Sequence, residues 1–153
     1  MSPVAIEPKP PVPGAVRPAP LEDDPGRSAR PTVAHLVTPY LFNTGSWIHS
    51  QLVYNREFRP IVLTQGTENL RLFPFEPVYD LSPEGRGARR PWFLVSKYLL
   101  GSYPPGPYLR VLAQEDARLL HAHLGWEAAR AARLARRFRR PFIASFYGRD
   151  AGL

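Results

Sequence analysis

The chain has 153 residues, of which 44% are hydrophobic and 22% charged, with 19 prolines, a net charge of +7 and no cysteine. The absence of cysteine excludes a disulfide framework and any cysteine-ligated zinc or iron–sulfur site. The positive charge comes almost entirely from arginine and favours anionic partners such as phosphates or acidic lipid head groups.

Residues 1–31 are expected to form a disordered, proline-rich tail. Nine of the 19 prolines fall in this stretch, and it contains no aromatic residue. Such a segment lacks the apolar area needed to offset the entropy that it would lose on ordering. Residues 32–153 hold every aromatic residue and are enough for one domain, not two.

No stretch has the apolar run that a secretory signal or a membrane-spanning helix requires. The most apolar segment, residues 92–100, is interrupted by Ser96 and Lys97. We therefore expect a cytoplasmic protein, with a peripheral position at the inner membrane face as the further option.

Short, nearly continuous apolar runs alternate with longer segments that have apolar residues at helical spacing. Ser46 is a residue type that caps helix N-termini, and Pro91 suits a first helical turn. The alternation predicts an α/β fold with a doubly wound, Rossmann-like parallel sheet. Strands are expected at 32–38, 60–65, 75–81, 118–124 and 141–147, and helices at 46–58, 91–100, 108–117 and 126–139.

Three segments follow predicted strands and should meet at the carboxyl edge of the sheet, where ligands bind in this class of fold. They are residues 39–46, 121–125 and 147–150. Gly45 and Ser46 open a helix, whose N-terminal amides can bind an anion; an ordinary serine cap is the alternative. No dinucleotide-binding glycine motif is present.

His121 and His123 are two residues apart on a predicted strand and therefore point to the same face. Three interpretations compete: a hydrogen-bonded core pair, a metal-binding pair, and a histidine that contacts a hydroxylated substrate. The metal interpretation needs further ligands, for which His35, His49, Glu127 and Asp150 are the candidates. The substrate interpretation is preferred because imidazole accepts and donates protons near neutral pH.

Four arginines recur at helical spacing and are predicted to share one face, opposite an alanine-rich stripe. They are Arg130, Arg133, Arg137 and Arg140. This face either keeps the domain soluble or makes a weak contact with an anionic membrane surface. Nucleic acid is not an expected partner, because no recognition helix or RNA-binding aromatic pattern is present.

The segment Leu120-His-Ala-His-Leu-Gly125, its alanine-rich helix and Pro141-Phe-Ile-Ala-Ser-Phe-Tyr-Gly-Arg-Asp150 together resemble the N-terminal domain of family-4 glycosyltransferases with the GT-B fold, of the kind that act in exopolysaccharide and colanic acid assembly. The opening strand and Ser46-Trp-Ile-His-Ser-Gln-Leu52 are similar to the first strand and helix of that family. The resemblance covers residues 33–150, and the similarity is weak in the middle of that range.

The resemblance implies retaining transfer of a sugar from a nucleotide-sugar donor to a glycan or lipid-linked acceptor, with the nucleotide sugar as co-substrate and no metal or other cofactor. It places His123 as the catalytic residue beside the transferred sugar, and Gly45 and Ser46 near the donor phosphates. The remaining candidates for substrate binding are His121, Gly125, Tyr147, Gly148 and Asp150. Tyr147 stands where relatives often have histidine.

The chain ends at Leu153, where the resemblance predicts the next helix. We expect a partial N-terminal domain that is inactive unless a C-terminal donor-binding half, as a separate chain, completes it. Two alternatives stay open: a non-catalytic module that binds an anionic surface or protein through its arginines, and a metal-dependent hydrolase that uses His121 and His123.

Overall fold

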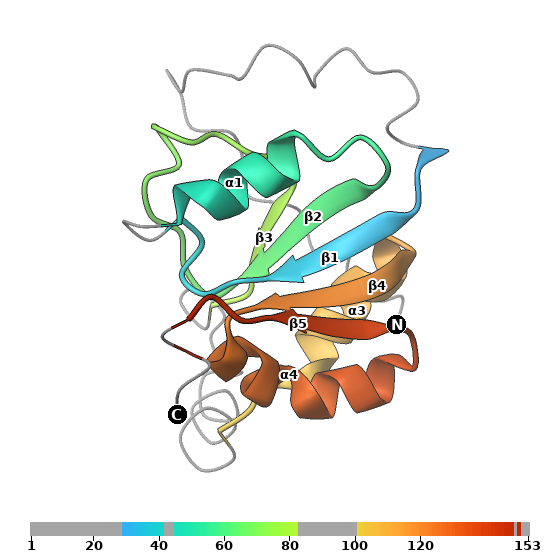
Figure 1. Ribbon diagram of the computed structural model, residues 1–153. Coiled ribbons are helices and arrows are strands. Elements are labelled where there is room, and N and C mark those ends of the chain that lie inside the picture. The colour runs from blue at the N-terminus through green and yellow to red at the C-terminus, as the bar shows by residue number, and fades with distance from the viewer. Residues whose placement is uncertain (1–28, 42–44, 83–100, 149, 151–153) are drawn as a thin grey trace.

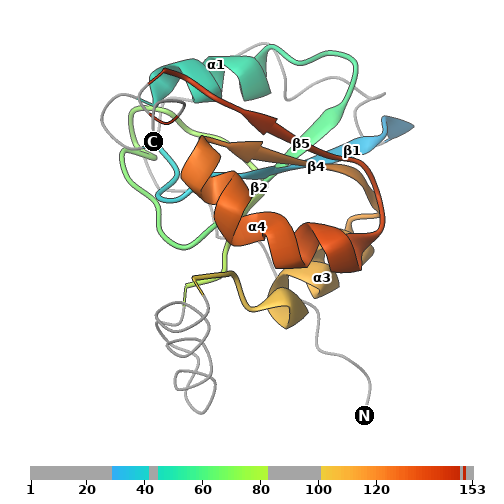
Figure 2. The same cartoon turned by 60° about the horizontal axis from the view of Figure 1, so that its bottom comes forward.

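The computed structural model describes residues 29–41, 45–82, 101–148 and 150, which form one all-parallel sheet with helices on both faces. The strand order is β3-β2-β1-β4-β5. Helix α1 lies over one face, and α3 and α4 lie over the other (Figure 1, Figure 2). The predicted α/β, doubly wound, Rossmann-like sheet is confirmed. The bounds are β1 Thr32–Leu36, α1 Ser46–Val53, β2 Arg59–Thr64, β3 Val78–Asp80, α3 Pro105–Gln114, β4 Ala117–His123, α4 Gly125–Phe138 and β5 Phe142–Ser145.

The central strands are buried on both faces, which explains their continuous apolar runs. Ala34 and Leu36 of β1 belong to the core beneath α3 and α4. Val37 belongs to the second core, which packs Ile48 and Leu52 of α1 against the other face. The predicted helix at 91–100 and most of the predicted tail lie outside the described residues.

Helix α1 begins at the predicted residue but is shorter than predicted and is capped differently. The capping position is occupied by Gly45, so Ser46 is the first helical residue and its hydroxyl does not cap. The helix ends at Val53 rather than near Phe58. The reason is that the Asn55 side chain accepts the backbone N–H groups of Glu57 and Phe58, which closes a turn.

Other elements also differ from their predicted bounds: β1 and β5 each end two residues early, and β3 and α3 differ for identifiable reasons. Strand β3 covers only three of the predicted seven residues because Pro77, just before it, has no N–H to donate to a ladder. Helix α3 begins three residues earlier than predicted, with proline in its first turn, and Asp116 at φ +42° ends it before β4.

One ion pair ties the amino ends of the sheet to the end of α3. The Arg59 guanidinium lies 2.5 Å from the Glu115 carboxylate, and the Tyr79 hydroxyl donates to the same carboxylate. Both charged side chains are mostly buried, with 22% and 14% of their surface exposed. Removing the Glu115 charge would therefore leave two buried donors without a full partner.

We predict that Glu115→Gln lowers the free energy of unfolding by about 1–3 kcal/mol, because Arg59 and Tyr79 both lose the charged acceptor. Asp116→Asn is the matched control, since its side chain is 65% exposed and pairs only at the surface. The control should change stability by less than about 0.5 kcal/mol in chemical denaturation. Equal effects of the two variants would contradict the prediction.

Candidate functional site

Two of the three segments predicted to meet at the carboxyl edge of the sheet are joined there by hydrogen bonds, and the helix that follows the first segment contacts them. Trp47, at the start of α1, packs on Tyr147 after β5 with ring centroids 4.0 Å apart. Tyr147 shares a 2.9 Å hydrogen bond with Nδ1 of His123, the last residue of β4. Trp47 and Tyr147, here called the aromatic platform, are half-buried, and His123 lies fully buried beneath them.

The turn from β4 into α4 shows why glycine stands at position 125. A Cβ at Gly125 would lie 2.6 Å from the Phe146 ring and 2.9 Å from the Asp150 carbonyl oxygen. The preceding Leu124 adopts φ +82°, a conformation that is costly for a residue with a side chain. Such strain is concentrated at functional sites.

Asp150 holds this turn against the end of β5. One carboxylate oxygen accepts the N–H of Gly125 at 2.7 Å, and the other accepts the N–H of Tyr147 at 2.8 Å. Burial acts to raise the pKa of Asp150, but these backbone donors hold it below its ordinary value. The carboxylate thus holds the backbone at Gly125 and at Tyr147 in place.

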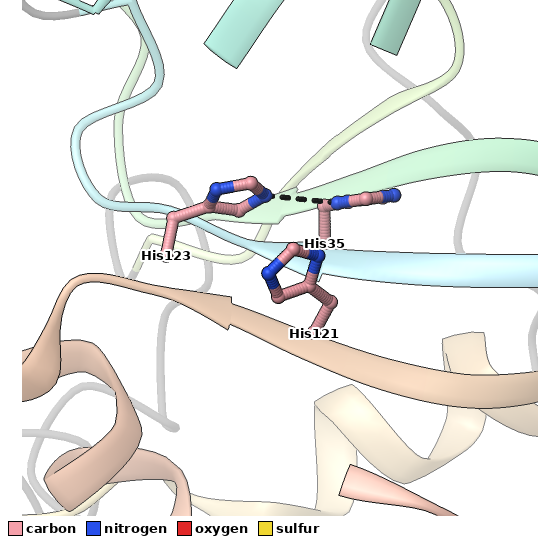
Figure 3. A group of neighbouring side chains, drawn as sticks. All are labelled: His35, His121 and His123. Atoms are coloured by element: carbon pink, nitrogen blue, oxygen red, sulfur yellow. Dashed lines mark hydrogen bonds between the residues drawn. The ribbon is translucent and has the colours of Figure 1, made fainter. Parts of the chain in front are cut away.

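His123 belongs to a compact group of three imidazoles. Parallel pairing places His35 of β1 directly beside His121 of β4. Nδ1 of His35 lies 2.9 Å from Nε2 of His123, and the rings of His121 and His123 are 4.1 Å apart. Figure 3 shows the three rings turned toward one another from the two strands. We call these residues the histidine cluster.

Burial keeps the histidine cluster neutral. It lowers the pKa of His35 to about 3 and the pKa of His123 to about 2, and repulsion from neighbouring imidazoles adds to this effect. The pKa of His121, which is only partly buried, is lowered as well. Both nitrogens of His123 have partners, so a ligand on the platform meets Tyr147 before it meets His123.

A second buried polar group lies on the opposite face of the same edge. The carboxyl group of Glu127, in the first turn of α4, is fully buried and contacts the Tyr103 hydroxyl. That hydroxyl also lies 3.3 Å from Thr38 Oγ1, and Arg130 lies 3.6 Å from Glu127. Burial raises the pKa of Glu127 to about 7, although Tyr103 and Arg130 oppose the shift.

The other predicted site residues lie in different environments. Ser46 and Gly148 are exposed next to the platform residues, and Gly45 is buried. Of the four arginines, Arg133 and Arg137 are exposed on α4, whereas Arg130 is half-buried over the Tyr103 ring. Arg140 lies beyond the end of α4 and pairs with Asp116 at 3.7 Å.

Sequence reasoning missed Trp47 as part of the site and named His35 only as one of several ligand candidates. A histidine at the centre of an otherwise apolar strand was the available signal for His35. His49 and Glu127, two other ligand candidates, do not join the cluster. No protein-family model matches the chain, and comparisons with curated proteins and with solved structures find no significant match.

We predict a pH-dependent contribution from Glu127. Its native pKa lies above its unfolded value of 4.5, so the native state binds more protons between pH 4.5 and 7 and this stabilisation is lost as the pH rises through that window. The stability of the wild type relative to Glu127→Gln should therefore fall by about 2 kcal/mol between pH 5 and pH 8.

Denaturation at several pH values measures this difference. The wild type and the variant contain the same histidines, so the contributions of the histidines to the pH dependence of stability cancel. Glu57→Gln, at an exposed position, is the matched control and should show a constant difference from the wild type. A constant difference for Glu127→Gln would contradict the prediction.

Proposed function

We propose that this chain is the acceptor-side part of a retaining glycosyltransferase of the GT-B type. One observation carries the proposal. The two motifs that resemble the family are about 20 residues apart in sequence, yet they build one site through the His123–Tyr147 and Gly125–Asp150 hydrogen bonds. The site lies at the carboxyl edge of the sheet, where ligands of doubly wound folds bind.

The chemistry of this site suits a sugar. A pyranose has apolar C–H faces and a rim of hydroxyl groups, and Trp47 and Tyr147 offer aromatic surface together with polar atoms. The neutral His123 shares a hydrogen bond with the Tyr147 hydroxyl, as acceptor or as donor. In this proposal the platform holds the acceptor, and His123 orients Tyr147 toward it.

The proposal assigns the nucleotide-sugar donor to a separate C-terminal half. Transfer of a sugar from a diphosphate leaving group requires donors that stabilise the developing negative charge, and this is usually the largest catalytic contribution. The side chains of the platform, Trp47 and Tyr147, carry no positive charge, and the exposed Arg133 and Arg137 lie on α4. Turnover is therefore expected only when the donor-binding half is present.

We predict saturable binding of a short oligosaccharide or a polyprenyl-linked sugar to the aromatic platform. Trp47→Ala and Tyr147→Phe should each weaken binding about tenfold, equivalent to ~1.4 kcal/mol, because each removes platform surface or a hydroxyl. Titration calorimetry with a panel of such acceptors provides the measurement.

Trp126→Ala is the matched control, because Trp126 is an exposed tryptophan on α4 for which the described structure shows no ring contact with Trp47 or Tyr147. It should bind like the wild type. Failure of every acceptor in the panel to bind, or an equal loss in Trp126→Ala, would count against the proposed function.

The exposed arginines of α4 favour a second candidate, a weak contact with an anionic membrane surface. Arg133 and Arg137 are exposed, and no ion pair engages them within the described part of the chain. Among the described segments, no helix has the length and apolar character needed to span a bilayer. Any membrane contact of these segments would therefore be peripheral and electrostatic.

We predict binding to vesicles that contain phosphatidylserine and weaker binding as salt is raised, because exposed charges are screened. The Arg133→Glu/Arg137→Glu double variant should abolish this binding in a vesicle sedimentation assay. The Arg56→Glu/Arg71→Glu variant makes the same charge change at exposed positions outside α4 and should retain more of it. Binding that survives high salt, or equal losses in both variants, would contradict the membrane contact.

A further inference from the structure

The histidine cluster contains more ligand atoms than its hydrogen bonds use. One nitrogen from each of His35, His121 and His123 lies within 4.8 Å of the other two. Two features of the fold bring the three rings together. Strand β1 pairs with β4 in the register that sets His35 beside His121, and His123 lies on the same face of β4 as His121. No other such group of three potential ligands is found among the described residues.

The hydrogen bonds of the cluster do not specify one tautomer of His35, and one of its nitrogens has no partner. Nε2 of His35 is buried without a partner in the described structure. If His35 Nδ1 donates to His123, its Nε2 is an unpaired acceptor; if His123 donates, the same Nε2 is an unpaired donor. Each tautomer therefore leaves Nε2 unpaired in the core, at a cost of roughly the desolvation of that group. An ion on Nδ1 would not remove this cost, but it would fix the one tautomer of His35 that carries its proton on Nε2.

Two of the three rings use one nitrogen for a hydrogen bond to a residue outside the cluster. The other nitrogen of each ring is therefore the candidate metal ligand. His121 shares a 2.8 Å hydrogen bond with Ser145 through Nε2, which leaves Nδ1 for a ligand. His123 contacts Tyr147 through Nδ1, so its ligand atom would be Nε2, which now shares a hydrogen bond with Nδ1 of His35. Histidines that bind metals characteristically donate their second ring N–H to such an outer partner, which fixes the tautomer.

We propose that His35, His121 and His123 form a binding site for a divalent transition-metal ion of the Zn²⁺ class. The ligand atoms are Nδ1 of His35, Nδ1 of His121 and Nε2 of His123. In a tetrahedral zinc site, with Zn–N distances of about 2.05 Å, neighbouring nitrogens lie about 3.3 Å apart. The 2.9 Å separation of His35 Nδ1 and His123 Nε2 opens slightly to reach that spacing, and the separations from the third nitrogen, at most 4.8 Å, adjust to it as well.

The donor set decides the class of ion. Three neutral imidazoles without a carboxylate favour Zn²⁺, Co²⁺ or Ni²⁺ over Mg²⁺ and Ca²⁺, which prefer oxygen ligands. Burial keeps the rings in the neutral form that binds metal. A cavity of about 370 Å³ adjoins the cluster, and His35 and His121 form part of its otherwise mostly apolar lining.

The proposed metal site and the aromatic platform use different atoms. Tyr147 links the two, because its ring forms the aromatic platform and its hydroxyl contacts the ligand residue His123. The ion would join β1 to β4 beneath the platform and hold His123 in one tautomer. Its test therefore uses metal binding alone, without acceptor or nucleotide sugar.

The experiment is a Zn²⁺ titration of the full chain after removal of metal with a chelator, followed by metal analysis after dialysis. We expect one equivalent of Zn²⁺ per chain and, with Co²⁺, the visible absorption of a tetrahedral imidazole site. His121→Ala should raise the Kd at least about 100-fold, since it removes a ligand, and Tyr147→Phe should raise it about 10- to 100-fold through the outer partner.

His49→Ala is the matched control. His49 is the remaining histidine of the chain, outside the cluster, and its ring hydrogen-bonds the Pro74 carbonyl oxygen. This variant should bind Zn²⁺ like the wild type. His121 is only half-buried, so His121→Ala should fold, as circular dichroism can verify; if it does not fold, the Co²⁺ spectrum of the wild type decides.

Two results would overturn the metal site. One is a wild-type chain that retains no Zn²⁺ and gives no tetrahedral Co²⁺ spectrum, which would leave a hydrogen-bonded histidine cluster only. The other is an equal loss of affinity in His49→Ala and His121→Ala. Neither result bears on acceptor binding, so failure of this inference and failure of the proposed function are distinguishable.

Discussion

The parallel pairing of β1 with β4 is the contact on which the rest of the structure depends. These two strands are distant in sequence and lie side by side at the centre of the sheet, where the order of the strands reverses direction. Because parallel strands bring their carboxyl ends to one edge, this pairing gathers residues 38–41, 123–127, 145–148 and 150 in one place. Most side chains of the pair are buried, so its buried polar side chains need partners.

The two faces of that pair meet this requirement in different ways. On the α1 face, three histidines stay neutral and share hydrogen bonds with one another, with Ser145 and with Tyr147. On the α4 face, Glu127 is buried against Tyr103, and burial raises its pKa. Buried polar groups of this kind are expensive, and a fold that keeps them at a ligand-binding edge is consistent with a functional role there.

The proposed sugar platform and the proposed metal site are successive layers of one construction. Trp47 and Tyr147 form the outer layer, and the histidine cluster lies directly beneath it. Asp150 fixes the backbone of both layers through the amides of Gly125 and Tyr147. A ligand on the platform and an ion in the cluster would therefore influence each other through the Tyr147 hydroxyl, without competing for the same atoms.

The amino-acid sequence by itself determined the class of fold and the approximate position of the strands and helices in the described region. Continuous apolar runs are sufficient for this because a strand buried on both faces has no polar side to display. The same reasoning identified His121 and His123 as neighbours on one face, since strand periodicity is a local property. It predicted the ends of α1 and α3 wrongly, because the Asn55 side chain ends α1 and the backbone conformation of Asp116 ends α3.

Only the tertiary structure decided which distant residues share the site. The register of β1 against β4 places His35 beside His121, and nothing within either strand's own pattern specifies that register. The contact of Trp47 with Tyr147 likewise depends on how α1 crosses the sheet. Local pattern reports the burial and periodicity of a segment, whereas a binding site is made by contacts between segments. Those contacts are fixed only when the whole core packs.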